Sequence, residues 1–146
     1  RDDIARIVLA YATQRYRRSA LFVIKKEMLV GWEGGGSEIS RAAVRGIMVP
    51  LTNPSIFKTV FETKVLYCGG VPHTTVNDIF FNALGDPRPE RVVVVPFVLK
   101  DKVACVLYAD GGDIDDENPA SIGELYQLGR AVSSAFENLI LRAKRS

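Results

Sequence analysis

The chain has 146 residues, of which 47% are hydrophobic and 25% are charged, a composition typical of one globular domain and not of a disordered segment. Its formal net charge of +2 is too small to indicate nucleic-acid or membrane binding, and no apolar run reaches the roughly 18–20 residues of a membrane span. Cys68 and Cys105 lack CxxC spacing, which favours structural thiols in the reducing cytoplasm. Without an initiator Met or a signal-peptide pattern, we expect a cytoplasmic segment of a longer protein.

The first segment predicts a helix that begins at Asp2 and Asp3, where acidic side chains favour the helix dipole, and ends near Arg17 and Arg18. Its apolar stripe has spacings of three and four. The stripe consists of Ile4, Ile7, Val8 and Tyr11. The arginines around Tyr16 could contact nucleic acid or an acidic partner, but a solvated helix end is the favoured interpretation.

Residues 20–24 and 28–33 predict two strands, and the second runs into the glycines at 34–36. A phosphate-binding loop would need a Lys-Ser or Lys-Thr pair directly afterwards. The sequence Ser-Glu-Ile-Ser follows instead, so these glycines are predicted to form a flexible strand exit.

The middle of the chain predicts short strands at 47–51 and 65–68, the second one ended by two glycines. A helix is expected to follow each strand. The first has Asn53 as its N-cap and Pro54 at its first position, and it runs to about Thr63. The second begins at Thr74 or Thr75 and stops at Gly85.

Residues 92–99 and 103–109 predict a strand hairpin that is apolar at nearly every position. Because a hairpin with one solvated face should alternate apolar and polar residues, both faces of this one are expected to be covered. The hairpin therefore belongs in the middle of a sheet.

The last helix is expected to begin at Pro119, with Ser121 and Glu124 at capping-box spacing. Its apolar stripe is wider than one sheet contact requires, which leaves surface for a partner helix. The acidic loop before it approaches calcium-loop spacing, but Asn118 stands where the sharp-turn glycine belongs, so a solvated loop is favoured. The acidic residues are Asp113, Asp115, Glu117 and Glu124.

This order of elements resembles a GAF domain, most closely at residues 20–24, 95–108 and 125–141. The related PAS fold has a similar outline. The resemblance implies an α+β fold, with an antiparallel sheet of about six strands between two helical layers and both terminal helices on one face. It also implies a sensory domain of a multidomain bacterial signalling protein, with an output domain in the same chain, homodimers formed through the terminal helices, and small ligands held on the opposite face.

Two sets of site residues follow from these expectations. The candidate ligand pocket combines aromatic and polar side chains, although the same residues could simply fill the core. The pocket residues are Trp32, Phe57, Phe61, Tyr67, Asn77, Phe81 and Tyr108. The candidate dimer interface consists of Ile4, Val8, Tyr11, Leu125, Val132, Phe136 and Leu139.

Catalysis is not expected. His73 has no second ligand in view, and Cys68 precedes Gly69, whereas bilin-binding relatives place a histidine there. Cys105 lies in mid-strand, where thiols are normally inert. We expect no cofactor, metal, nucleic acid or membrane partner. The main hypothesis is a non-catalytic sensory domain that binds a small ligand; the alternative is a ligand-free dimerisation or docking module, and a redox enzyme of the same fold ranks third.

Overall fold

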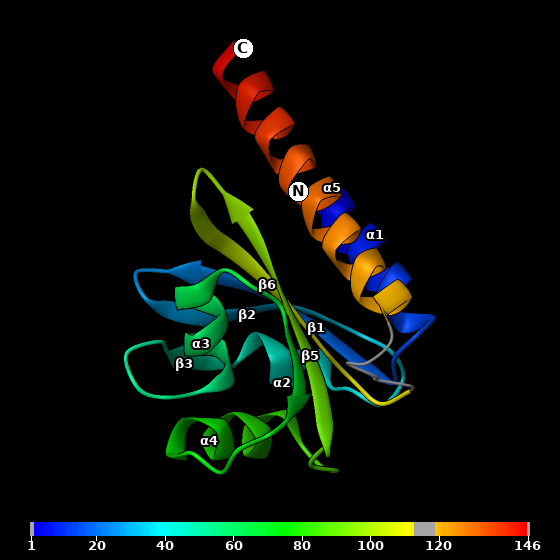
Figure 1. Cartoon of the computed structure of the whole chain (residues 1–146), viewed down its shortest axis with the longest axis vertical. Coiled ribbons are helices and arrows are strands. Elements are labelled where there is room, and N and C mark those ends of the chain that lie inside the picture. The colour runs from blue at the N-terminus through cyan, green and yellow to red at the C-terminus, as the bar shows by residue number, and fades with distance from the viewer. Residues whose placement is uncertain (1, 113–118, 146) are drawn as a thin grey trace.

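A computed structural model describes residues 2–112 and 119–145 as a six-stranded antiparallel sheet with helices on both faces (Figure 1). This is the fold class that the sequence predicts. The strands follow the order β3-β2-β1-β6-β5-β4 across the sheet. In chain order, the elements are α1 (Asp2–Thr13), β1 (Arg18–Lys25), β2 (Met28–Gly35), α2 (Arg41–Arg45), β3 (Met48–Pro50), α3 (Ile56–Thr63), β4 (Tyr67–Gly70), α4 (Thr75–Leu84), β5 (Arg91–Leu99), β6 (Lys102–Asp110) and α5 (Pro119–Arg145).

The central hairpin of β5 and β6 is buried on both faces, as its apolar pattern predicts. Val92 and Val94 pack in the cluster beneath α2, α3 and α4. Val93 and Val95 point the opposite way, into the cluster beneath α1 and α5. Alternate side chains of a strand point to opposite faces, so a continuous valine run supplies both cores. Figure 1 shows α1 and α5 on one side of the central hairpin and α3 and α4 on the other.

Helix α1 is shorter than predicted, because it ends at Thr13 and not near Arg17. The amides of Arg15 and Tyr16 both donate to the Ala12 carbonyl, so the chain turns out of the helix there. Arg18 already belongs to β1 and lies opposite Asp110 of β6. Pairing with the sheet therefore outweighs the local preference of arginine for a helix end.

The predicted flexible exit at the glycines is also wrong in part, since Gly34 and Gly35 continue β2 and pair with β1. The region after them contains the short helix α2, which the sequence reasoning missed. The Ser40 hydroxyl caps this helix by accepting from the Ala43 amide at 3.1 Å. A helix of five residues has too few turns to show a periodic apolar pattern.

Helix α3 begins later than predicted, with Ser55 as its N-cap in place of Asn53. The Ser55 hydroxyl accepts from the Lys58 amide at 3.0 Å. Strand β4 includes Gly69 and Gly70, which were expected to end it. For α4, the structure selects Thr74 as N-cap, and Gly85 is the C-cap as predicted.

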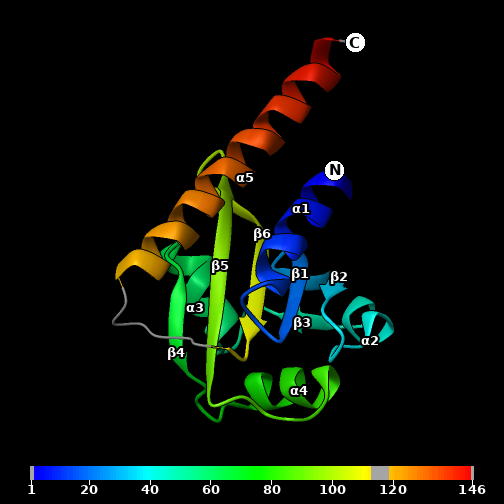
Figure 2. The same cartoon turned by 90° about the vertical axis from the view of Figure 1, so that its right-hand side faces the viewer.

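Helix α5 runs past the edge of the sheet, so its C-terminal part projects from the body of the molecule (Figures 1 and 2). It spans 27 residues. Within residues 2–112 and 119–145, no helix combines the length and the apolar character needed to cross a membrane.

Candidate functional site

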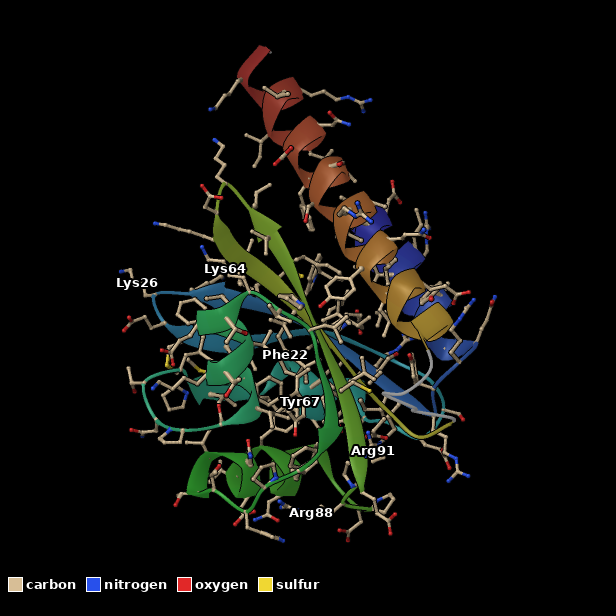
Figure 3. The ribbon with its side chains drawn as sticks, in the orientation of Figure 1. Phe22, Lys26, Lys64, Tyr67, Arg88 and Arg91 are labelled. Carbon is tan, nitrogen blue, oxygen red and sulfur yellow. The ribbon has the colours of Figure 1, made fainter. Side chains whose placement is uncertain are left out.

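The face beneath α3 and α4 is filled by large rings, which we call the aromatic cluster. Its members are Phe22, Phe57, Phe80, Phe81 and Tyr108. The rings of Phe57 and Phe80 have centroids 4.5 Å apart, and Tyr108 lies 5.3 Å from Phe80. These distances lie at the close end of ring packing in protein cores. Figure 3 shows Phe22 at the centre of this layer.

Three predicted pocket residues, Phe57, Phe81 and Tyr108, therefore meet in the aromatic cluster, where each is at most 4% exposed. Phe61 and Tyr67 pack against the same core from its edge and are half-buried. The arrangement brings these five residues to one face of the sheet, in contact with a packed interior.

Asn77 lies beside them, fully buried, and its side chain hydrogen-bonds to backbone groups. Its side-chain oxygen accepts from the Ile56 amide at 3.1 Å, and its side-chain nitrogen donates to the Pro72 carbonyl at 2.9 Å. One amide side chain thereby joins the start of α3 to the loop before α4.

Trp32 is separated from the other six predicted pocket residues. It packs with the cluster beneath α1 and α5, and its ring centroid is 6.5 Å from that of Phe136. Its position in β2 explains this, because neighbouring strand residues alternate between the faces of the sheet. The structure therefore places Trp32 on the opposite face of the sheet from the other six residues.

The structure places a buried ion pair where the sequence reasoning saw only a helix end and a loop. The side chains of Arg18 and Asp110 are 2% and 6% exposed, and Arg18 Nη2 lies 2.7 Å from an Asp110 carboxylate oxygen. Arg18 Nε also donates to both carboxylate oxygens, at 3.0 and 3.1 Å. The two residues lie directly opposite each other in the β1/β6 pairing. No sequence signal revealed that register.

Neighbouring backbone carbonyls and a hydroxyl form further hydrogen bonds with this pair. Arg18 Nη1 donates to the Gly85 carbonyl and Nη2 to the Pro87 carbonyl, both at 2.8 Å. The Tyr108 hydroxyl donates to Asp110. Burial would lower the pKa of Arg18, but the hydrogen bonds and charge of Asp110 outweigh it and raise that pKa. Burial and Asp110 together raise the pKa of Tyr108 well above its usual value, so its hydroxyl stays a donor.

A cavity of about 360 Å³ opens beside this ion pair. Its rim carries charges of both signs, including Arg17, Arg91 and Glu90. Figure 3 shows Arg91 at the lower end of β5, near the connection from α4. The mixed charges favour no single class of ligand.

On the opposite face, α1 and α5 are joined through polar contacts at one end. Tyr11 donates to Glu124 at 3.2 Å, and the Arg15 guanidinium lies 3.5 Å from the same carboxylate. The Arg15 guanidinium also lies 3.9 Å from the centre of the Tyr11 ring. A groove of about 250 Å³ separates the two helices where Ile4 faces Leu139.

Only part of the predicted dimer interface is available on the surface of one chain. Val8, Leu125 and Val132 are each at most 5% exposed, because they pack on the sheet. Ile4, Tyr11, Phe136 and Leu139 are half-buried. Among the residues of these helices whose burial is described, the exposed large apolar side chains are instead Ile7, Tyr126 and Leu141, at 65%, 44% and 50%. The stripe that predicted an interface is mostly the stripe that covers the sheet.

The remaining candidates have ordinary surroundings. His73 is exposed, and its ring lies 3.2 Å from Asp78. Cys68 and Cys105 both contribute to the cluster beneath α1 and α5. The acidic positions 113, 115 and 117 lie outside the described residues. Among the residues that are described, no group of three or more His, Cys, Asp or Glu side chains could hold a metal ion.

No protein-family model matches the sequence. No curated protein matches it either. Solved structures do resemble the fold. The second GAF domain of DevS from Mycobacterium smegmatis has a TM-score of 0.74 at 19% identity, covering 99% of both chains. The GAF domain of a two-component sensor histidine kinase from Bacillus halodurans has a TM-score of 0.72 at 20% identity, covering 97% of each.

A methyl-accepting chemotaxis protein, residues 122 to 287, has a TM-score of 0.73 at 18% identity, covering 96% of this chain and 89% of that one. These identities are too low to carry a function across, but the coverage extends over nearly the whole chain. The fold that the sequence resemblance implied is confirmed: this chain has the fold of a GAF domain.

Proposed function

We propose that this chain is a non-catalytic regulatory domain of a larger signalling protein and that it acts through α1 and α5. The observation that carries the proposal is the contrast between its faces. Rings fill the space beneath α3 and α4, whereas α1 and α5 lie together on the other face with a groove of about 250 Å³ between them, and α5 continues past the sheet. The sensor-kinase and chemotaxis neighbours support the same role.

In this proposal, the aromatic cluster replaces a resident ligand, and the terminal helices form the working surface toward a second copy or an output domain. A small-ligand sensor is the second candidate function. It is favoured by the cavity beside Arg18 and Asp110, which is large enough for a small molecule.

A thermal-shift screen against nucleotides, purines, amino acids and haem separates these candidates. A ligand at 100 times its Kd stabilises a protein by about 2.7 kcal/mol, which is readily measured. We expect no shift. A shift that Phe81→Leu abolishes, measured against that variant's own melting temperature, would place a ligand in the aromatic cluster and contradict the proposal. A shift that persists in Phe81→Leu but is lost in Arg17→Gln would establish the second candidate.

A further inference from the structure

Three segments far apart in the sequence meet at what we call the Arg18 junction. It consists of the side chains of Arg18, Tyr108 and Asp110 and the carbonyl groups of Gly85 and Pro87. Arg18 begins β1, directly after the corner that follows α1. Asp110 ends β6, ahead of α5, and the two carbonyls belong to the connection between α4 and β5.

The geometry of arginine makes this junction stiff. A guanidinium is planar and presents its donors in a fixed fork. Donors of the single Arg18 group reach Asp110 on one side and the two loop carbonyls on the other, all within 3.1 Å. A shift of the loop after α4 must therefore move the guanidinium, stretch these bonds or break them.

The same junction reaches the end of α1 through the backbone, and α1 in turn contacts α5 through Tyr11 and Glu124. The Arg17 amide donates to the Asp110 carbonyl at 3.0 Å, which ties the corner after α1 to the end of β6. Directly afterwards, Gly112 has a positive φ of 71°, and a Cβ there would lie 2.3 Å from the Arg15 carbonyl oxygen. The chain that leads toward α5 thus presses closely against the chain that leaves α1.

We propose that the Arg18 junction is the mechanical link through which a displacement of α4 reaches α1 and α5, with Arg18 as its positioning residue. This inference rests on the proposed function, in which the terminal helices carry the signal. Tyr108 also connects the aromatic cluster to this junction, because its ring packs in the cluster and its hydroxyl donates a hydrogen bond to Asp110.

Native-state amide exchange on the unaltered protein tests the link. The Gly85 amide bonds to Phe81 at the end of α4, and the Arg17 amide reports on the junction. If the two are coupled, both amides should open as one subglobal unit, with the same opening free energy and the same denaturant dependence. That opening free energy should be lower than the free energy of global unfolding, which the Leu107 amide in the central strand reports. Separate denaturant dependences for Gly85 and Arg17 would overturn the proposal.

A variant comparison measures the strength of the link. Leu84 is the last residue of α4 and is 4% exposed, so Leu84→Ala disturbs the end of that helix. We expect exchange at Arg17, relative to Leu107, to rise by about twofold to thirtyfold. The rise should disappear in an Arg18→Lys background, which keeps the charge but loses the fork.

The matched control is Arg45→Lys, which makes the same change at the exposed pair of Arg45 with Glu33 and should leave the rise intact. An equal rise in both backgrounds would refute the link. If Arg18→Lys does not fold, the exchange data on the unaltered protein decide. Because exchange is read without a ligand or partner, failure of the link is distinct from failure of the proposed function, which the thermal-shift screen tests.

Discussion

Burial of an ion pair costs free energy unless its donors and acceptors are matched, and Arg18 meets this condition through acceptors from two parts of the chain. Removal of one partner from such a pair typically costs about 3–5 kcal/mol, because the other charge is left buried alone. Tyr108 serves both the apolar core and the ion pair with one side chain. The sequence left two interpretations of its ring open, a ligand pocket or a filled core; the ring is buried among other rings, and its hydroxyl donates to Asp110.

Gly31 is the position at which added volume should be least tolerated. Its amide donates to the Ile47 carbonyl at 2.9 Å, and a Cβ at this site would lie 1.6 Å from the Val44 carbonyl oxygen. Gly31→Ala must therefore push α2 away from β2. We expect it to lower the free energy of unfolding by about 3 kcal/mol or more, measured by urea denaturation.

The matched control is Gly123→Ala on α5, where a Cβ meets no heavy atom within 4 Å. Because alanine favours the helix, that variant should be more stable by about 1 kcal/mol. Equal effects at the two sites would show that close packing at Gly31 does not constrain the fold.

At the scale of elements, strands and helices with strong local patterns were predictable and their register was not. The valine run of β5 required two covered faces, and the structure has them. Helix α2 was not predicted because its five residues are too few to show a periodic apolar pattern. Arg18 reads locally as a cationic helix end, and only its pairing with Asp110 across the sheet reveals its role. Pairing partners depend on the assembled sheet, so no local pattern in the sequence reports them.

Asn77 connects two elements and should matter more than its polarity suggests. Asn77→Ala leaves the buried Ile56 amide without its partner, whereas the exposed Pro72 carbonyl still accepts from the Thr74 amide at 3.1 Å. One unsatisfied buried group costs about 1–3 kcal/mol, so we expect a loss of that size in thermal or urea unfolding.

Asn82 provides the comparison, because it lies on the same helix but is exposed. Asn82→Ala should change the free energy of unfolding by less than about 0.5 kcal/mol. A loss at Asn77 no larger than at Asn82 would mean that another group takes over its hydrogen bonds.

At the scale of the whole molecule, the two helical layers differ in how they cover the sheet. The layer of α2, α3 and α4 encloses the aromatic cluster. Helices α1 and α5 cover the other face, and α5 continues past the sheet (Figure 2). The predicted pocket rested on residue type and the predicted interface on the spacing and width of the helical apolar stripe, and neither property divides apolar residues between an internal core and an external surface. Burial makes that division: Val132 packs inside, whereas Leu141 remains outside.

The predicted homodimer can be tested with one residue type on two faces. Ile7 on α1 is 65% exposed, and Ile79 on α4 is 58% exposed. If copies associate through α1 and α5, Ile7 becomes buried in the dimer interface. Ile7→Glu then removes an apolar contact worth about 1.5–3 kcal/mol from each half of a two-fold interface. The dimer Kd should then rise by at least roughly a hundredfold. Sedimentation equilibrium over a range of concentrations measures this change.

Ile79→Glu introduces the same charge on the opposite layer and should leave the Kd unchanged. A dimer weakened by Ile79→Glu and unaffected by Ile7→Glu would move the interface to the α4 face. A monomer at every concentration would leave α1 and α5 as a docking surface for another domain.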